Sequence, residues 1–397
     1  MIISLAEIII LSLIVDWVFR KMTIPGLVGM LLLGVVFGPY ALGWVNKDLL
    51  DVSSDFRLIA LIIILLRAGL ELSKETLNRV GARALVLSAV PAIIEGTAIT
   101  ALGPPLLGLT YMESAILGSV LAAVSPAVVV PMMIGFMKRG LGVKKGIPTM
   151  ILAAASIDDV FVIIVYGVLI GVHTGTSVNI AWKLAGIPIS IVLGTVIGAV
   201  MGFVLYHLFR HFYSRTTKRV LVILALSVLL IQFEHLVIEW VPFAALLAVM
   251  TIGFIILEKD QHMAHEISVK LGKIWVFAEI VLFTMVGAQV DLQVALEAGL
   301  TGVVIIVLGL VARSVGTYGC LIGSAFTSAE RRFIVISYLP KATVQAAIGG
   351  APLAAMHLAG MDTAPGEIIL AVAVLSILIT APLGAWAIAI TGEKWLG

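Results

Sequence analysis

The sequence is short of charge and of cysteine, and both shortages exclude classes of protein. Only 12% of its 397 residues are charged and 61% are hydrophobic, which leaves too little polar surface to cover a soluble globule. The net charge of +2 does not favour nucleic-acid binding. Cys320 is the single cysteine, so no internal disulfide framework or thiolate metal site is expected. With a mean hydropathy of +1.17, the chain is predicted to be an integral membrane protein.

Long polar and low-complexity runs are also missing, so no separate soluble domain or disordered tail is expected. The opening stretch from Ile2 to Phe19 is apolar, but no basic region precedes it and no small-residue cleavage site follows. It is therefore interpreted as a retained span rather than a removed signal.

Apolar runs recur along the whole chain and are separated by short polar breaks. A helix needs roughly 20 apolar residues to cross the bilayer, and it satisfies its own backbone groups. The pattern predicts an all-α polytopic membrane protein with about 13 transmembrane helices. The predicted spans are 3–19, 24–43, 57–71, 83–108, 112–137, 147–172, 181–208, 218–233, 237–257, 272–290, 298–323, 332–356 and 366–391.

Basic residues are distributed unequally between the two ends of these spans. Most of the 25 Lys and Arg lie in connections that follow odd-numbered spans, and only Lys47, Arg57 and Lys183 lie on the opposite side. The positive-inside rule then predicts that the N-terminus is outside and the C-terminus inside. A plasma membrane, in a bacterium the inner membrane, is the expected location.

Proline and glycine interrupt two spans that are seven apart and therefore run in opposite directions. The first contains Ser125-Pro126 with Pro131, and the other contains Pro340 with Gly349-Gly350. Either proline alone is compatible with a tolerated kink. Paired interruptions in inverted orientation are typical of secondary transporters, whose sites lie at the midplane where half-helix ends meet. Inverted-topology repeats with two crossing broken helices are predicted.

Several charges fall inside the predicted spans. Asp158 lies about 12 residues into its span, or roughly 17 Å, which is mid-bilayer. The same arithmetic places its neighbour Asp159, and also Glu95, Arg313 and Lys341, at depths where they can converge. An ionised group at such depth is costly unless it is paired or hydrated, so these residues are candidates for function.

The adjacent pair Asp158-Asp159 is the strongest of these signals. Neighbouring side chains on a helix point about 100° apart, so one counter-ion rarely serves both. Burial and mutual repulsion favour protonation of at least one carboxyl group, which allows exchange of a proton for a metal cation. Asp158 and Asp159 are therefore predicted to bind Na⁺ or Li⁺ in competition with H⁺.

The other buried charges are predicted to support this pair. The three acids outnumber Arg313 and Lys341 by one, so the site lacks one positive charge, which a proton or a monovalent cation would supply. Glu95 is predicted to pair with Arg313, because arginine keeps its charge where lysine can lose it. Lys341 is expected either to neutralise helix ends or to contact Asp158, and the sequence leaves both open.

Oxygen ligands for the cation are expected nearby. Ser156 lies three residues before Asp159 on the same helical face, although a small residue there is equally suited to helix packing. The broken stretch at Val124-Ser125 is expected to add backbone carbonyls and a hydroxyl group.

These residues resemble the monovalent cation:proton antiporters, in particular the sodium/proton antiporter branch related to eukaryotic NHA-type exchangers. The resemblance covers nearly the whole chain, and its most specific elements are the double aspartate and the last of the matching motifs. The motifs are Ile24-Pro25-Gly26 with Gly34 and Gly38-Pro39, Ala68-Gly69-Leu70-Glu71, Ser125-Pro126, Ser156-Ile157-Asp158-Asp159 and Leu339-Pro340-Lys341-Ala342-Thr343-Val344-Gln345-Ala346-Ala347.

The resemblance implies a homodimer in which a core of six helices moves like an elevator against a scaffold, with Asp159 as the principal ion ligand. Scaffold and dimer helices would occupy 1–82 and 173–297, the latter with a linker, and the core 83–172 and 298–397. Val124-Ser125-Pro126 departs from the Thr-Asp-Pro of many bacterial relatives, so an acid is missing there. Arg313 stands where electrogenic relatives have lysine, which favours electroneutral exchange.

Exchange of Na⁺ or Li⁺ for H⁺ has several alternatives. A K⁺/H⁺ exchanger, a Na⁺-coupled symporter of organic anions and a passive cation channel share much of the pattern. An intramembrane aspartyl protease needs two carboxylates from different helices, whereas the obvious acids here are adjacent. A transporter rather than an enzyme is therefore expected, without a cofactor beyond the transported ions.

Overall fold

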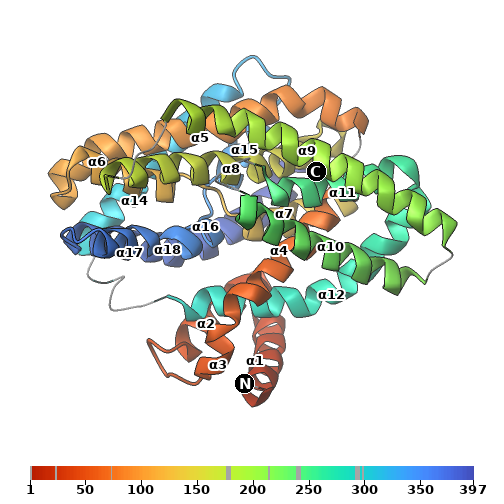
Figure 1. The fold of residues 1–397 in the computed structure, drawn as a ribbon, viewed down its shortest axis with the longest axis horizontal. Coiled ribbons are helices and arrows are strands. Elements are labelled where there is room, and N and C mark those ends of the chain that lie inside the picture. The colour runs from red at the N-terminus through yellow and green to blue at the C-terminus, as the bar shows by residue number, and fades with distance from the viewer. Residues whose placement is uncertain are drawn as a thin grey trace.

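The computed structural model describes residues 2–22, 25–72, 74–175, 180–212, 215–237, 243–290, 296 and 299–397. Their regular secondary structure is helical throughout, as Figure 1 shows. The helices of the N-terminal half are α1 (Ile2–Lys21), α2 (Gly26–Phe37), α3 (Lys47–Asp51), α4 (Ser53–Gly69), α5 (Lys74–Leu107), α6 (Tyr111–Leu121), α7 (Pro126–Lys138), the 3₁₀ turn η1 (Val143–Lys145), α8 (Ile147–His173) and α9 (Ile180–His211). Those of the C-terminal half are α10 (Thr216–Val237), α11 (Ala245–Lys259), α12 (Gln261–Ala288), α14 (Gly299–Cys320), α15 (Ser328–Ser337), α16 (Thr343–Ile348), α17 (Ala351–Leu358) and α18 (Ala364–Leu396).

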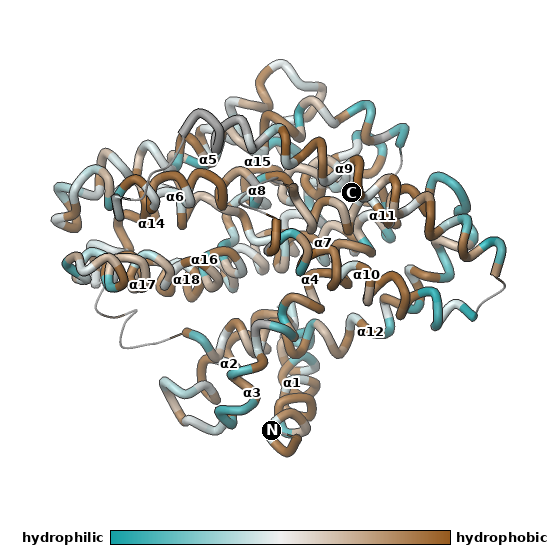
Figure 2. The backbone as a smooth tube through the Cα atoms, in the orientation of Figure 1, coloured by the Kyte–Doolittle hydropathy of each residue, from teal (hydrophilic) through white to brown (hydrophobic). Residues whose placement is uncertain are grey.

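The helices have the lengths and apolar character of membrane spans. Within the described residues, 9 helical segments are long and apolar enough to cross a bilayer, and α2 is a shorter apolar helix. Figure 2 shows hydrophobic residues along the helices and hydrophilic ones gathered at many of the turns between them. The all-α polytopic fold is confirmed, while the total of about 13 spans stays a prediction. The side chain of Lys183 and residue Ile24 lie outside the described part of the chain.

Some predicted boundaries differ from the observed helix ends. Helices α5 and α12 begin 9 and 11 residues before the apolar runs predicted to start at 83 and 272. Polar first turns extend both helices, and at α12 the Asp260 side chain accepts the N–H of Met263 at 2.9 Å as an N-cap. Val237 ends α10 instead of opening the next span. An apolar run marks the part of a helix in lipid, and the hydrogen-bonded helix continues beyond it.

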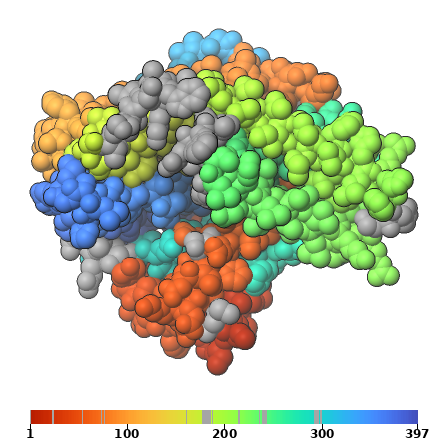
Figure 3. All heavy atoms as spheres, in the orientation of Figure 1, coloured from red at the N-terminus to blue at the C-terminus, as the bar shows by residue number. Residues whose placement is uncertain are grey.

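The helices pack in two sets. In Figures 1 and 3 the blue C-terminal helices α17 and α18 lie on the left, the green α10 on the right and the red α1 at the bottom. In one set, α5 packs along α6, α8 and α14, and α18 packs on α15 and α17. In the other, α12 packs on α2 and α4, and α11 packs on α4 and α9. The scaffold and core roles of these segments stay predictions. The proposed boundary between residues 82 and 83 needs correction, because it falls inside α5.

Glycines bring helices α4 and α11 into close contact. A Cβ atom on Gly253 of α11 would meet the carbonyl oxygen of Leu66, and one on Gly69 of α4 would meet that of Met250. Small residues let backbones approach closely where no hydrophobic effect draws helices together in lipid. Each of the two helices contributes one glycine to the contact, so the contact depends on both.

Two helical regions are broken, as predicted, and the breaks meet. The first lies between α6 and α7, and the other between α15 and α16, with a further interruption at Gly349-Gly350. The N–H of Ser125 in the first break donates to the carbonyl of Pro340 in the second at 2.9 Å. Pro126 is the first residue of α7, but Pro131 lies inside α7 and does not mark the break. Its grouping with the broken stretch was therefore wrong.

The α4–α11 contact predicts that alanine lowers thermal stability at a glycine in the contact but not at a glycine outside it. Replacement of Gly253 by alanine should lower the temperature of thermal unfolding by several degrees, because the new methyl group meets the Leu66 backbone. Gly81→Ala in α5 is the control, since an added Cβ there meets nothing within 4 Å. It should leave the temperature unchanged or raise it slightly, because alanine favours helix by about 1 kcal/mol over glycine. Equal unfolding temperatures for both variants would contradict the contact.

Candidate functional site

The end of α6 at the first break exposes carbonyl groups that the interrupted helix leaves without partners. Three side chains from distant parts of the chain supply them with donors. Gln345 Nε2 donates to the carbonyls of Val120 and Ala123 at 3.1 Å each. Lys341 Nζ donates to the carbonyl of Leu121, and Arg313 Nη1 to that of Ala122. Cations are stabilised at a helix C-terminus, so the free carbonyl groups at the break favour the basic side chains of Lys341 and Arg313.

The same two cations hold two of the buried acids. Arg313 Nη1 lies 2.8 Å from Glu95 Oε2, and Arg313 Nη2 lies 3.2 Å from Asp158 Oδ2. Lys341 Nζ lies 2.7 Å from Glu95 Oε1. The predicted contact between Glu95 and Arg313 is present, and Lys341 contacts Glu95 and the helix end instead of Asp158. All four side chains are buried, and their two positive and two negative charges balance.

The residues of the first break are already engaged with this network. The backbone N–H of Val124 donates to Asp158 Oδ2 at 2.8 Å. The hydroxyl oxygen of Ser125 lies 3.4 Å from that of Thr343, which is the first residue of α16 after the second break. Val124 therefore meets an acid through its N–H, although its carbonyl was the expected ion ligand. The ligand roles of Val124 and Ser125 stay predictions.

Asp159 faces away from the network. With Ser156 and Pro126 it lines a cavity of about 140 Å³ whose remaining described walls come from α4, α8, α9, α10, α11 and the two residues before α11. Its Oδ1 atom is buried and has no hydrogen-bond partner among the described residues. The Ser156 hydroxyl donates within its own helix, to the carbonyl of Leu152 at 3.0 Å. The neighbouring aspartates thus face different surroundings, as their angular separation on a helix requires.

The geometry shows which acid lacks the positive charge that the sequence leaves unassigned. The positive charge that the site lacks belongs to Asp159, because Glu95, Asp158, Arg313 and Lys341 already balance. Among the described residues that line the cavity, none is basic. A cation or a proton at Asp159 would complete the neutralisation of the five groups.

Three residues of the site were missed from the sequence. Gln345 lies five residues after Pro340, and an amide beside a broken helix is suited to cap carbonyls. The Tyr338 ring is buried with the Arg313 guanidinium carbon 5.6 Å from its centre, in cation–π geometry. Glu234 of α10 lines the Asp159 cavity. An acid in an apolar helix is a sign of function that the sequence contains. Glu234, however, stands at the end of a predicted span.

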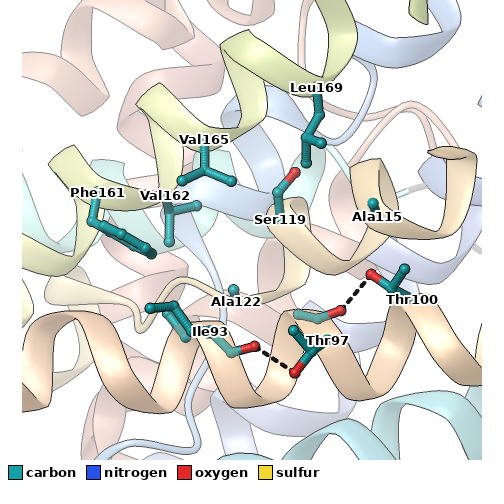
Figure 4. A pocket seen from close by; sticks show the side chains of 12 residues that line it. Ile93, Thr97, Thr100, Ala115, Ser119, Ala122, Phe161, Val162, Val165 and Leu169 are labelled. Atoms are coloured by element: carbon teal, nitrogen blue, oxygen red, sulfur yellow. Dashed lines mark hydrogen bonds between the residues drawn. The ribbon is translucent and has the colours of Figure 1, made fainter. Parts of the chain in front are cut away.

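A second cavity differs from the Asp159 cavity because its described lining carries no acid. It encloses about 230 Å³ between α5, α6 and α8, and Figure 4 shows that its labelled side chains are apolar or small hydroxyl groups. The hydroxyls of Thr97 and Thr100 donate to the carbonyls of Ile93 and Gly96 in their own helix. No titratable group lines it among the described residues. The cavity at Asp159 is therefore the better candidate for an ion site.

A polytopic helical bundle with two broken helices crossing at buried charges defines the class of secondary transporters. Known proteins give the same result in more detail. Residues 8–393 match the family model for the transmembrane sodium/hydrogen exchangers. The chain is 34% identical to human sodium/hydrogen exchanger 9B2 over 381 residues, which cover 94% of this chain and 70% of that one. It is 31% identical to human sodium/hydrogen exchanger 9B1, over 94% of this chain and 73% of that one.

Solved structures share the fold. Two structures of the sodium proton antiporter MjNhaP1 from Methanocaldococcus jannaschii align with TM-scores of 0.78 and 0.80, at 20% and 19% identity. Both alignments cover 100% of this chain, and they cover 98% and 97% of the antiporter chains. The protein belongs to the sodium/hydrogen exchanger family. It is a multi-pass transporter of the cation/proton antiport class rather than an enzyme, which excludes the protease alternative.

Removal of a buried arginine and removal of an exposed one are expected to change stability by different amounts. Arg313→Ala should lower the free energy of unfolding by about 3 to 5 kcal/mol, because it leaves two buried carboxylates without their shared cation. Arg139→Ala is the matched control, since Arg139 forms a 2.7 Å ion pair with Glu393 at the surface. Such surface pairs contribute little. Denaturation in detergent measures both variants, and similar losses would contradict the role of Arg313.

Proposed function

We propose that the protein exchanges Na⁺ or Li⁺ for H⁺, and that the two ions compete for the carboxylate of Asp159. The proposal rests on the charge of Asp159, which has no counter-ion among the described residues of the cavity that it lines. Asp158, in contrast, is held by Arg313 and Val124. The names of the relatives, sodium/hydrogen exchangers and a sodium proton antiporter, support the same ions.

Competition follows from the charges around the pair. Two neighbouring carboxylates in a water-poor interior are stable only when a positive charge accompanies the second. A proton or a small cation meets this need, but both use the same oxygen atoms. Asp158 takes part through its Oδ1 atom, which lacks a hydrogen-bond partner among the described residues, while Oδ2 stays anchored. Release of one ion therefore favours binding of the other.

Hard cations such as Na⁺ and Li⁺ prefer oxygen ligands, and Ser156 adds a hydroxyl oxygen on the wall of the same cavity. The cavity of about 140 Å³ also has room for water molecules that complete the coordination shell. K⁺ exchange, the alternative left open by the sequence, is decided by comparing the three cations in the transport assay.

Alternating access is proposed to occur by an elevator motion. The Asp159 cavity has walls from both sets of helices, with Ser156 on α8 and with α4, α10 and α11 opposite. Sliding of the set containing α5–α8 and α14–α18 against the other would carry the charge-balanced site across the bilayer. A homodimer in the plasma membrane, with the N-terminus outside and the C-terminus inside, completes the proposal.

The central prediction concerns Asp159 itself. In proteoliposomes, Asp159→Ala and the double variant Asp158→Asn/Asp159→Asn should reduce exchange of Na⁺ or Li⁺ for H⁺ to the background of empty vesicles. Internal pH reports the exchange after each cation is added, with K⁺ as the comparison. Asp362→Asn, which replaces an exposed acid, should exchange at the normal rate. Normal exchange by Asp159→Ala would show that another group binds the ions.

A separate prediction concerns electroneutrality. Arg313 contacts Glu95, Asp158 and the carbonyl of Ala122, so it is expected to keep its proton through the cycle. One proton should then exchange for one cation, and an imposed membrane voltage should not change the initial rate. Potassium gradients with valinomycin impose the voltage while internal pH is recorded. A rate that rises with voltage of one sign and falls with the other would contradict equal charge exchange.

A further inference from the structure

A second acid faces the cavity that contains Asp159. Glu234 lies near the end of α10 and lines the same space of about 140 Å³, together with Ser190 and residues 243–246. It belongs to the other set of packed helices from Asp159, because α10 packs on α4, α11 and α12. The two carboxylates therefore approach one cavity from elements that the proposed transport motion would separate.

Part of the environment of Glu234 has a structural explanation. Its carboxylate accepts the backbone N–H of Ala245, the first residue of α11. The N-cap residue of α11 is Ala244, whose side chain offers no acceptor, so Glu234 supplies one to the helix N-terminus. A glutamine would meet this need equally well. The cap accounts for an acceptor at this place, but it does not require a charge.

In the part of the cavity lining that the structure describes, Glu234 has no counter-ion. Among the described residues of its lining, the ionisable ones are Glu234 and Asp159, and none is basic. A carboxylate within a membrane protein is costly unless it is paired, and residues of this kind usually serve the transported ion. One monovalent cation and one proton would neutralise both acids at the same time.

A larger cavity adjoins this one. It encloses about 740 Å³ between α4, α10 and α16 and is lined by Asp55, Arg57, Gln232 and Thr343 among others. Leu61 lines both cavities. Its polar side chains and its volume give a hydrated ion room beside the cavity that contains Glu234 and Asp159.

We propose that Glu234 is a second cation-binding carboxylate, which holds arriving Na⁺ or Li⁺ opposite Asp159 in one conformation of the transport cycle. This inference rests on the proposed function of Asp159. Because α10 does not travel with α8 in that proposal, Glu234 contacts the cation on only one side of the membrane. It raises affinity for the cation there, while Asp159 remains the site that carries the ion across.

The test uses Glu234→Gln, which keeps an acceptor for the N–H of Ala245 but removes the charge. In proteoliposomes with one protein orientation, the KM for Na⁺ added to one membrane face should rise about three- to tenfold, with the maximal rate retained. From the opposite face the KM should stay at the wild-type value. The Na⁺ concentration that gives half-maximal thermal stabilisation in detergent should rise by a similar factor.

Glu113→Gln is the matched control. Glu113 also caps a helix N-terminus, by accepting the N–H of Thr110 at 2.7 Å, and it does not line the cavity. It should leave both Na⁺ measurements unchanged. Wild-type KM and wild-type Na⁺ stabilisation in Glu234→Gln would overturn the inference and leave only the capping role, which Glu234→Ala would reveal as lost stability.

Failure of the underlying function would look different. If Asp159→Asn still exchanged Na⁺ for H⁺, the proposed function would fall whatever Glu234→Gln showed. If Asp159→Asn were inactive and Glu234→Gln behaved as wild type, only the inference about Glu234 would fall.

Discussion

The site depends on the unpaired carbonyl groups where α6 is interrupted. A broken helix inside a membrane is stable only when other groups satisfy its backbone, and here Gln345, Lys341 and Arg313 do so. Two of these donors are cations and need negative partners at the same depth. Glu95 and Asp158 are those partners. Satisfying the broken backbone therefore assembles a neutral cluster of four charges.

Neutrality of this cluster gives Asp159 its distinct position. The helix α8 carries Asp158 toward the cluster and Asp159 toward the cavity, about 100° away around the helix. Asp158 is thereby anchored by Arg313 and Val124, whereas Asp159 lines the cavity, where we propose that its carboxylate exchanges ions. Because the cavity lies between the two sets of helices, any relative movement of these sets alters the surroundings of Asp159 and leaves the cluster intact.

Much of this arrangement was predictable from local features of the sequence. Apolar run lengths indicated the helical membrane fold, and Pro126 and Pro340 indicated the two breaks. Buried charges are so costly in lipid that Glu95, Arg313 and Asp158 had to be close to one another. Pro131 gave a wrong indication, because a proline inside a helix does not by itself interrupt the helix when another donor satisfies the carbonyl group that its missing N–H leaves free.

The sequence by itself determined the membrane class, the broken helices and the set of charges that had to meet. Only the tertiary structure decided that Lys341 contacts Glu95, that Gln345 caps α6, and that Glu234 shares a cavity with Asp159. Hydropathy and helical periodicity are properties of one chain segment. They therefore indicate how deep a residue lies in the membrane and on which face of its helix. The partner across a helix interface depends on how segments more than 70 residues apart pack together, which no local pattern encodes.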